Sequence, residues 1–170
     1  METVPYIEKT HDYYRRLGYD KPYQYAVNGA PPFVPLRKPL SASRLVMVSS
    51  AGIDIIPHDG PAPVPFKGRN IGDNHKAEVF DIPSDIAKER LLYISGAHNR
   101  RESDMHDIDA YFPVTRLREL CDEGLIGSLA ENHLRIRPCY SQRKTRELDA
   151  PEVLRKCQAL GADVVLLVPV

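Results

Sequence analysis

Three short apolar runs constrain the fold of this chain more than any other feature. They cover residues 44–49 (RLVMVS), 90–95 (RLLYIS) and 163–168 (DVVLLV), and none of them alternates between apolar and polar side chains. Strands without such alternation are typical of a parallel sheet whose two faces are both covered. The runs therefore predict three buried strands in an α/β domain.

Two helix patterns lie between the second and third runs. Val114 to Glu123 places its apolar side chains on one face and ends before Gly124. The other pattern begins at Asp149 as an N-cap, has Pro151 in its first turn and ends at Gly161. A helix, a short loop and a strand make half of a βαβ unit. We therefore predict a Rossmann-like half domain built on a parallel sheet.

The N-terminal part of the chain has a different sequence pattern. Residues 4–17 form an amphipathic helix pattern that Gly18 would end, and a proline-rich stretch follows. Because proline excludes regular helix and central strand, we predict an extended arm whose apolar groups dock on the domain or on another subunit. The predicted division is residues 1–43 for helix and arm and residues 44–170 for the α/β domain. We predict that residues 51–88 form a long irregular segment, with a hairpin near 77–81.

Charge and hydrophobicity exclude several classes of protein. A chain of 170 residues with 23 basic and 23 acidic side chains has the size of one domain and lacks the basic surface of a nucleic-acid binder. Its longest apolar stretch, residues 164–170, is far shorter than the roughly 20 residues of a membrane span, and its start is too polar for a signal peptide. Three cysteines without a CxxC spacing indicate free thiols. We expect a soluble cytoplasmic protein with no membrane or nucleic-acid partner.

A polar segment directly after the second run supplies the first candidate site residues. Residues 98–109 (HNRRESDMHDID) contain two imidazoles and four carboxylates, which suit acid–base work or cation binding. His98 lies nearest the crevice expected at the carboxyl edge of the sheet. The spacing matches no metal signature, so we predict no metal site. A solvated polar loop is the plain alternative, and a metal-dependent hydrolase using His98 and His106 is the weakest one.

Two further positions are candidates for the same crevice. The turn that contains Ser50 and Gly52 follows the first run and offers free amide groups to an anion, although it is not a GxGxxG loop. His133 follows a glycine-rich turn, and it either points into the crevice or serves the structure.

The cysteines give a weaker signal. Cys139 lies near several arginines, a setting that favours thiolate, and the plain alternative is a small buried side chain. Cys121 and Cys157 fall on apolar helix faces, so we predict that both are core residues. The residues alone thus predict an α/β domain with a polar crevice.

Four segments in series resemble one protein family. They are YIEKTHDYYRRLGYDKPYQYA, PPFVPLRKPLSASRLVMVSSAGI, DIDAYFPVTRLRELCDEGLIGSLAENH and GADVVLLVPV. Together they resemble the glycine/sarcosine/betaine reductase selenoprotein B family, which is similar also to a subunit of D-proline reductase. The chain departs from the family at Gly96, where relatives often carry a histidine, and at Pro138 and Cys139, where they carry glycines.

The resemblance implies reductive cleavage of a carbon–nitrogen bond in glycine, betaine, sarcosine, proline or a similar amine. A pyruvoyl group on a partner subunit would capture the amine, and a selenolate or thiolate would attack the α-carbon. No cofactor is expected within this chain itself. The resemblance makes His98, Asp107 and His133 candidate catalytic residues, and we take Ser50, Gly52 and Asp109 as candidate substrate-binding residues.

The family also implies what should follow Val170. There the strand resembling VVLLVPV is followed by selenocysteine or cysteine, then proline and a second cysteine. We expect that the chain is truncated at an in-frame UGA codon and that its 170 residues alone are inactive. A short natural paralogue is the competing account. The alternative function is a non-catalytic small-molecule or partner-binding module that forms homo-oligomers.

Overall fold

The computed structural model of the chain describes residues 5–21, 29–30, 34–61, 77–94, 107–137 and 141–170. The chain divides into two compact units, Met1–Val34 and Pro35–Val170, and each is described by itself. The boundary predicted between residues 43 and 44 stays a prediction. None of the described helices has the length and hydrophobicity that a membrane crossing requires.

The first unit contains the predicted amphipathic helix. This helix, α1 (Tyr6–Arg16), ends where Gly18 adopts a φ of 85°, a left-handed conformation that glycine tolerates well. The amide of Gly18 donates to the carbonyl of Arg15 at 3.0 Å and closes the last turn. No residue of α1 is buried. The prediction of a helix stopped by Gly18 is therefore confirmed.

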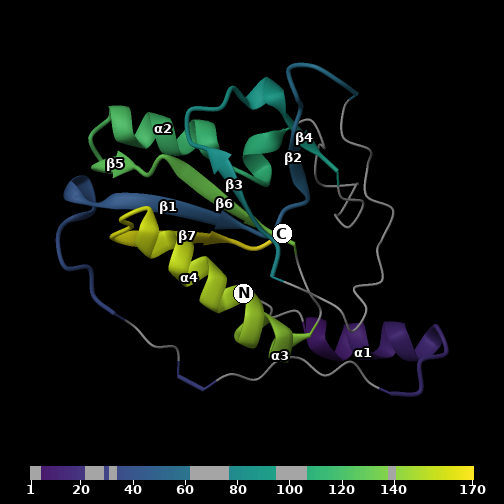
Figure 1. The fold of residues 1–170 in the computed structure, drawn as a ribbon. Helices are drawn as coiled ribbons and strands as arrows, with labels where there is room; N and C mark the ends of the chain where they lie inside the picture. The colour runs from purple at the N-terminus through teal and green to yellow at the C-terminus, as the bar shows by residue number, and fades with distance from the viewer. Residues whose placement is uncertain (1–4, 22–28, 31–33, 62–76, 95–106, 138–140) are drawn as a thin grey trace. The chain divides into compact units, whose positions relative to one another are not determined.

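A mostly parallel sheet forms the centre of the second unit (Figure 1). Strand β1 (Arg44–Ser49) pairs in parallel with β5 (Ser128–Leu129) and then β6 (Asn132–Ile136) on one side, and with β7 (Val164–Val168) on the other. Strand β3 (Val79–Pro83) pairs antiparallel with β6 at the far edge. The predicted α/β class with a parallel sheet is confirmed.

A second, two-stranded sheet corrects one strand prediction. The run predicted as a buried strand over 90–95 forms β4 (Leu91–Tyr93), but it pairs antiparallel with β2 (Ile53–Ile55) and does not join the parallel sheet. The hairpin predicted near 77–81 is also wrong, because β3 pairs with the distant β6 and not with its chain neighbour. An apolar run in the sequence indicates a buried strand, but it does not indicate which strand pairs with it.

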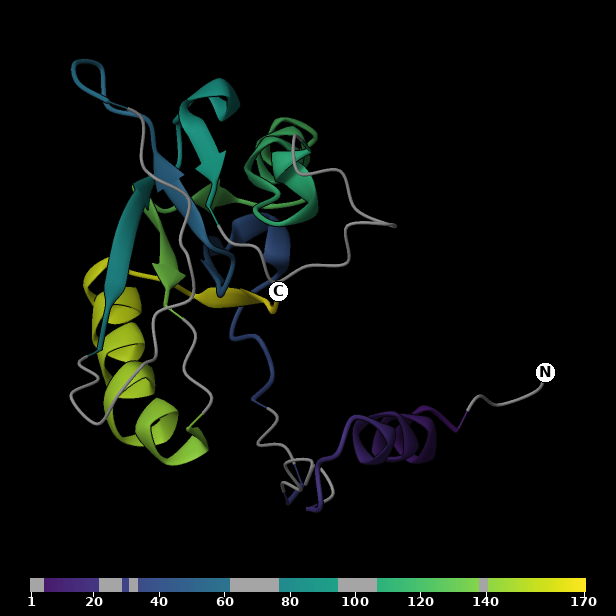
Figure 2. The same cartoon turned by 90° about the vertical axis from the view of Figure 1, so that its right-hand side faces the viewer.

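The parallel sheet buries a separate core against each face. Alternate residues of β1 point to opposite faces, so Leu45 and Met47 join the core beneath α2 (Val114–Asp122), while Val46 and Val48 join the core beneath α4 (Ala150–Ala159). Figures 1 and 2 show the two helices on opposite sides of the sheet. The absence of alternation in β1 thus reflects burial on both faces.

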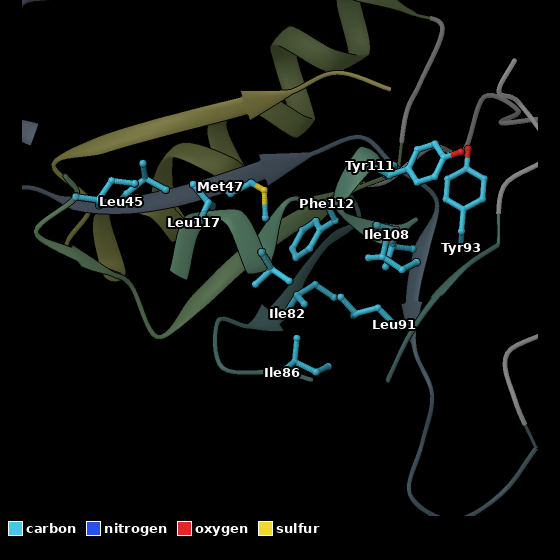
Figure 3. Packing of buried hydrophobic residues seen from close by; sticks show 14 residues of the cluster. Leu45, Met47, Ile82, Ile86, Leu91, Tyr93, Ile108, Tyr111, Phe112 and Leu117 are labelled. Atoms are coloured by element: carbon cyan, nitrogen blue, oxygen red, sulfur yellow. The ribbon is translucent and has the colours of Figure 1, made fainter. Parts of the chain in front are cut away.

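Phe112 fills the centre of the larger core. It is fully buried among Met47, Ile82 and Ile108, as Figure 3 shows. Close by, the rings of Tyr93 and Tyr111 stack with centroids 4.3 Å apart. This contact packs the small sheet against the segment that leads into α2.

Strand β7 differs from β1 in its exposure. Val165, Leu166 and Leu167 are all exposed, and Leu167 keeps 67% of its surface in solvent. The expectation that both faces of this strand are covered is therefore wrong within the described part of the chain. Strand β7 is an edge strand that carries the apolar side chains of an interior one.

The helical segment before β7 begins earlier than the sequence predicts. Asp149 has helical backbone angles and its side chain does not cap α4, because the helix already starts with α3 (Gln142–Lys144). The hydroxyl of Ser141 accepts the cap bond from the amide of Lys144 at 3.3 Å. A π-helical turn, Thr145–Asp149, joins the two helices next to Pro151, which lacks an amide hydrogen. The N-cap predicted at Asp149 is wrong for this reason, while the helix over 150–159 is confirmed.

Gly127 provides a test of how closely the segment before β5 packs against the backbone before β1. A methyl group at Gly127 would lie 2.8 Å from the backbone carbon of Ala42 and from the amide nitrogen of Ser43. We expect Gly127→Ala to lower the free energy of unfolding by roughly 1–3 kcal/mol. The added methyl group would clash with backbone atoms, which cannot move aside as a flexible side chain could. Denaturant titration measures the change. Gly29→Ala, where nothing lies within 4 Å, is the control, and equal stabilities for both variants would contradict the packing.

Candidate functional site

The candidate site is the carboxyl edge of the three parallel strands, where one row of residues crosses the sheet. In register, Phe80 of β3 pairs with Arg135 of β6, Arg135 pairs with Ser49 of β1, and Ser49 pairs with Val168 of β7. Paired residues point to the same face of a sheet. These four side chains therefore face the side that α2 covers. Ligands of open α/β sheets collect at this edge.

Ser49 ties the edge of the sheet to the segment before α2. It is fully buried, and its hydroxyl donates to the carbonyl of Tyr111 at 2.9 Å and accepts from the amide of Ala51 at 3.1 Å. The same hydroxyl thus fixes both the turn after β1 and the segment that carries Asp107 and Asp109. Ser49 has a structural task at the base of the candidate crevice.

Ser50 holds the end of β7 at this edge. Its amide donates to the carbonyl of Val168 at 3.2 Å, which extends the ladder by one residue. Its hydroxyl accepts from the amide of Val170 at 2.9 Å and donates to the carbonyl of the same residue at 3.3 Å. The side chain predicted to bind substrate therefore clamps the backbone of Val170. Its substrate-binding role stays a prediction.

The other predicted substrate-binding residues lie around the same edge. The carbonyl of Gly52 accepts from the amide of Ile94 at 2.6 Å and joins the turn after β1 to the end of β4. Asp109 accepts a bond from the amide of Thr115 at 3.0 Å, so its carboxylate serves the first turn of α2. Asp107 is exposed, and its carbonyl accepts from the amide of Ala110 at 3.1 Å. Within the described ranges, no hydrogen bond joins any of these three residues to Ser50.

His98 and His106 lie outside the described residues, as does Cys139. Within the described ranges, no group of three or more His, Cys, Asp or Glu side chains is placed to hold a metal ion. The roles of these residues stay predictions.

His133 is buried within the sheet, with 0% of its surface exposed. It lies where the partner of β1 changes from β5 to β6, and its Nδ1 accepts a bond from the Met47 amide at 3.1 Å. An accepting Nδ1 carries no proton, so the neutral ring is protonated at Nε2. Nε2 is buried with no hydrogen-bond partner among the described residues. His133 therefore completes the sheet at a break in its ladder.

The surroundings of His133 oppose a positive charge. Burial, and secondarily the charge of Arg118, lowers the pKa of His133 to about 4. The imidazole is therefore neutral at pH 7. The catalytic role predicted for it stays a prediction.

The low pKa of His133 predicts how stability depends on pH. Between pH 6.5 and about 4 the unfolded chain binds a proton that the folded chain excludes, so stability falls as the pH falls through this range. We expect a loss of roughly 3 kcal/mol from this residue. The side-chain oxygen of an asparagine at this position can accept the hydrogen bond from the Met47 amide, and asparagine does not titrate in this pH range. Urea unfolding of His133→Asn should therefore show a shallower pH dependence, and an identical slope in both proteins would contradict the assignment.

The two described cysteines are not activated nucleophiles. Burial raises the pKa of the Cys157 thiol, and burial followed by the charge of Asp122 raises that of Cys121. Both thiols are therefore protonated near neutral pH. Cys157 is a core residue as predicted, while Cys121 is half-buried beside the core under α2.

Arg135 is the site residue that the sequence analysis missed. It is only 6% exposed, and its guanidinium lies 4.1 Å from the centre of the Phe80 ring. The alternation of Leu134 and Ile136 with His133 and Arg135 is the signal of a strand at this position. That pattern predicts a strand that contains Arg135, although it does not show that Ser49 lies beside it.

Comparison with known proteins gives one match. Over 138 residues, or 81% of this chain, the sequence is 26% identical to D-proline reductase subunit gamma of Acetoanaerobium sticklandii (strain ATCC 12662). The aligned part covers 52% of that subunit, so the chain spans about half the length of the curated relative it matches. No protein-family model and no solved structure matches the chain. The similarity supports a relationship to reductase components at the level of the family.

Proposed function

We propose that this chain is the α/β component of a cytoplasmic reductase that cleaves a carbon–nitrogen bond in glycine, betaine, sarcosine, proline or a similar amine. The similarity to D-proline reductase subunit gamma supports the reaction class. The observation that carries the proposal is the clamp between the Ser50 hydroxyl and the backbone of Val170. It fixes the residue after which the selenoprotein B family carries its nucleophile.

Within this proposal the residues of the chain have distinct tasks. Ser50 positions the end of β7, and a selenocysteine or cysteine after Val170 supplies the nucleophile for the α-carbon. His98 and Asp107 bind substrate or transfer protons. Gly52 and Asp109 shape the substrate end of the crevice. His133 acts as a positioning residue, because its ring supports β1 at Met47. The pyruvoyl group belongs to a partner subunit in this proposal.

Expression of the gene with its downstream nucleotides tests the proposal. In a host that inserts selenocysteine, we expect a product longer than 170 residues that contains selenium, or a cysteine at the same place. With the partner subunit and a dithiol reductant, it should cleave the carbon–nitrogen bond of at least one of these substrates, which frees an amine from glycine, betaine or sarcosine and opens the ring of D-proline.

Changing the nucleophile after Val170 to alanine should abolish this cleavage, since neither described cysteine thiol is activated. Ser50→Ala should slow it, because the hydroxyl no longer holds Val170. An authentic stop codon followed by unrelated sequence would contradict the proposal.

A second candidate function is a non-catalytic binding module that assembles from copies of this chain. The observation in its favour is β7, an edge strand with no charged residue, whose Val165 and Leu167 line an apolar groove of about 370 Å³ beside α4. An antiparallel pair of β7 strands centred on Leu166 would place valine opposite valine at its ends. The formal net charge of zero gives two copies no long-range repulsion.

Sedimentation measures this association. The second function predicts a dimer that Leu167→Lys converts to monomer, because a lysine on an edge strand opposes strand pairing. Leu125→Lys is the matched control, since Leu125 is also an exposed leucine but lies outside β7. A wild-type monomer at high concentration, or equal effects of both variants, would contradict pairing through β7.

A further inference from the structure

Arg135 is a buried cation without an anionic partner among the described residues. No ion pair of Arg135 is found there within 4.0 Å, and its Nε is buried with no hydrogen-bond acceptor. Its neighbour Glu78 pairs with Arg137 at 2.7 Å. The guanidinium lies over the aromatic face of Phe80.

This arrangement is costly for the folded protein. A guanidinium does not lose its proton in proteins, so burial without an ion-pair partner leaves its charge only partly compensated. Burial lowers the pKa of Arg135, the charge of Arg137 acts in the same direction, and the charges of Asp54 and Glu78 only partly offset the two. A fold that merely needed to fill this position would be served better by an apolar side chain. The cost indicates that a negative group completes the site when it is bound.

The position of Arg135 points to a small ligand at the carboxyl edge. It lies in the row that continues through Ser49 to Val168, and two strand spacings separate Arg135 from Val168, roughly 10 Å. Ser49 itself is covered by the segment that contains Tyr111, so a molecule held at Arg135 would lie at the end of β6, on the carboxyl edge of the sheet. This is the edge at which the clamp of Ser50 fixes Val170.

We infer that Arg135 binds the carboxylate of an amino-acid ligand. The planar fork of arginine matches a carboxylate with two parallel hydrogen bonds, and the Nε of Arg135 has no acceptor among the described residues. A single charge suits this site better than a phosphate dianion, because the other nearby cation, Arg137, is already paired with Glu78. The choice of amino acids as ligands rests on the proposed function, whereas anion binding by Arg135 does not.

Thermal unfolding and calorimetric titration of the chain with D-proline, glycine, sarcosine and betaine test this inference. We expect at least one of them to bind and to raise the unfolding temperature. Pyrrolidine, which keeps the ring of proline without its carboxylate, should do neither. Arg135→Met should weaken binding at least tenfold, as loss of a charge-assisted hydrogen bond implies, while its own unfolding temperature stays equal or rises. Arg135→Lys keeps the charge without the fork, and it should bind with intermediate affinity.

Arg137→Met is the matched control, since it removes an arginine of the same strand end that is already paired. It should keep the wild-type affinity. The inference is overturned if none of the four carboxylates binds, if pyrrolidine binds as well as D-proline, or if Arg135→Met and Arg135→Lys both retain wild-type affinity. Binding that depends on Arg135 in a protein without reductase activity would contradict the proposed function alone. Reductase activity with full affinity in both variants would contradict this inference alone.

Discussion

The parallel pairing of β1 with neighbours on both sides is the constraint on which the rest of the second unit depends. Because β1 pairs in parallel with β6 along one side and with β7 along the other, the carboxyl ends of the three strands lie at one edge of the sheet. That edge places Arg135, Ser49 and Val168 in one row, although they are distant in the sequence. The two cores above and below β1 supply the hydrophobic burial that holds this row in place.

Two buried polar residues of β6 illustrate how similar positions serve different purposes. His133 and Arg135 are two residues apart, so they point to the same face of the strand. The imidazole of His133 accepts a bond from Met47 and thereby completes the sheet. The guanidinium of Arg135 lies nearer the edge, and its Nε has no hydrogen-bond acceptor among the described residues. The first residue supports the fold, and the second is paired only when a ligand completes the site.

The sequence predicts the strands and helices that bury apolar side chains, and it misses the strand that buries polar ones. Strand β1, α2 and α4 follow from apolar runs and helix periodicity, and Gly18 ends α1 as its position indicates. Strand β6 has no continuous apolar run, because His133 and Arg135 alternate with its apolar residues, and an analysis based on apolar runs therefore misses it. The partner of β4 and the cap at Ser141 depend on contacts that a local pattern does not contain. For the candidate site, the sequence places Ser50 and Gly52 in the turn after β1, where the structure has them, but it could not show that Arg135 lies at the same edge.

A crystal structure of the chain grown with saturating D-proline would test the central claim most directly. The account predicts the ligand carboxylate within hydrogen-bond distance of the Arg135 guanidinium at the carboxyl edge of the sheet. A carboxylate of this same chain bonded to Arg135 in its place, or a ligand bound away from this edge, would contradict it.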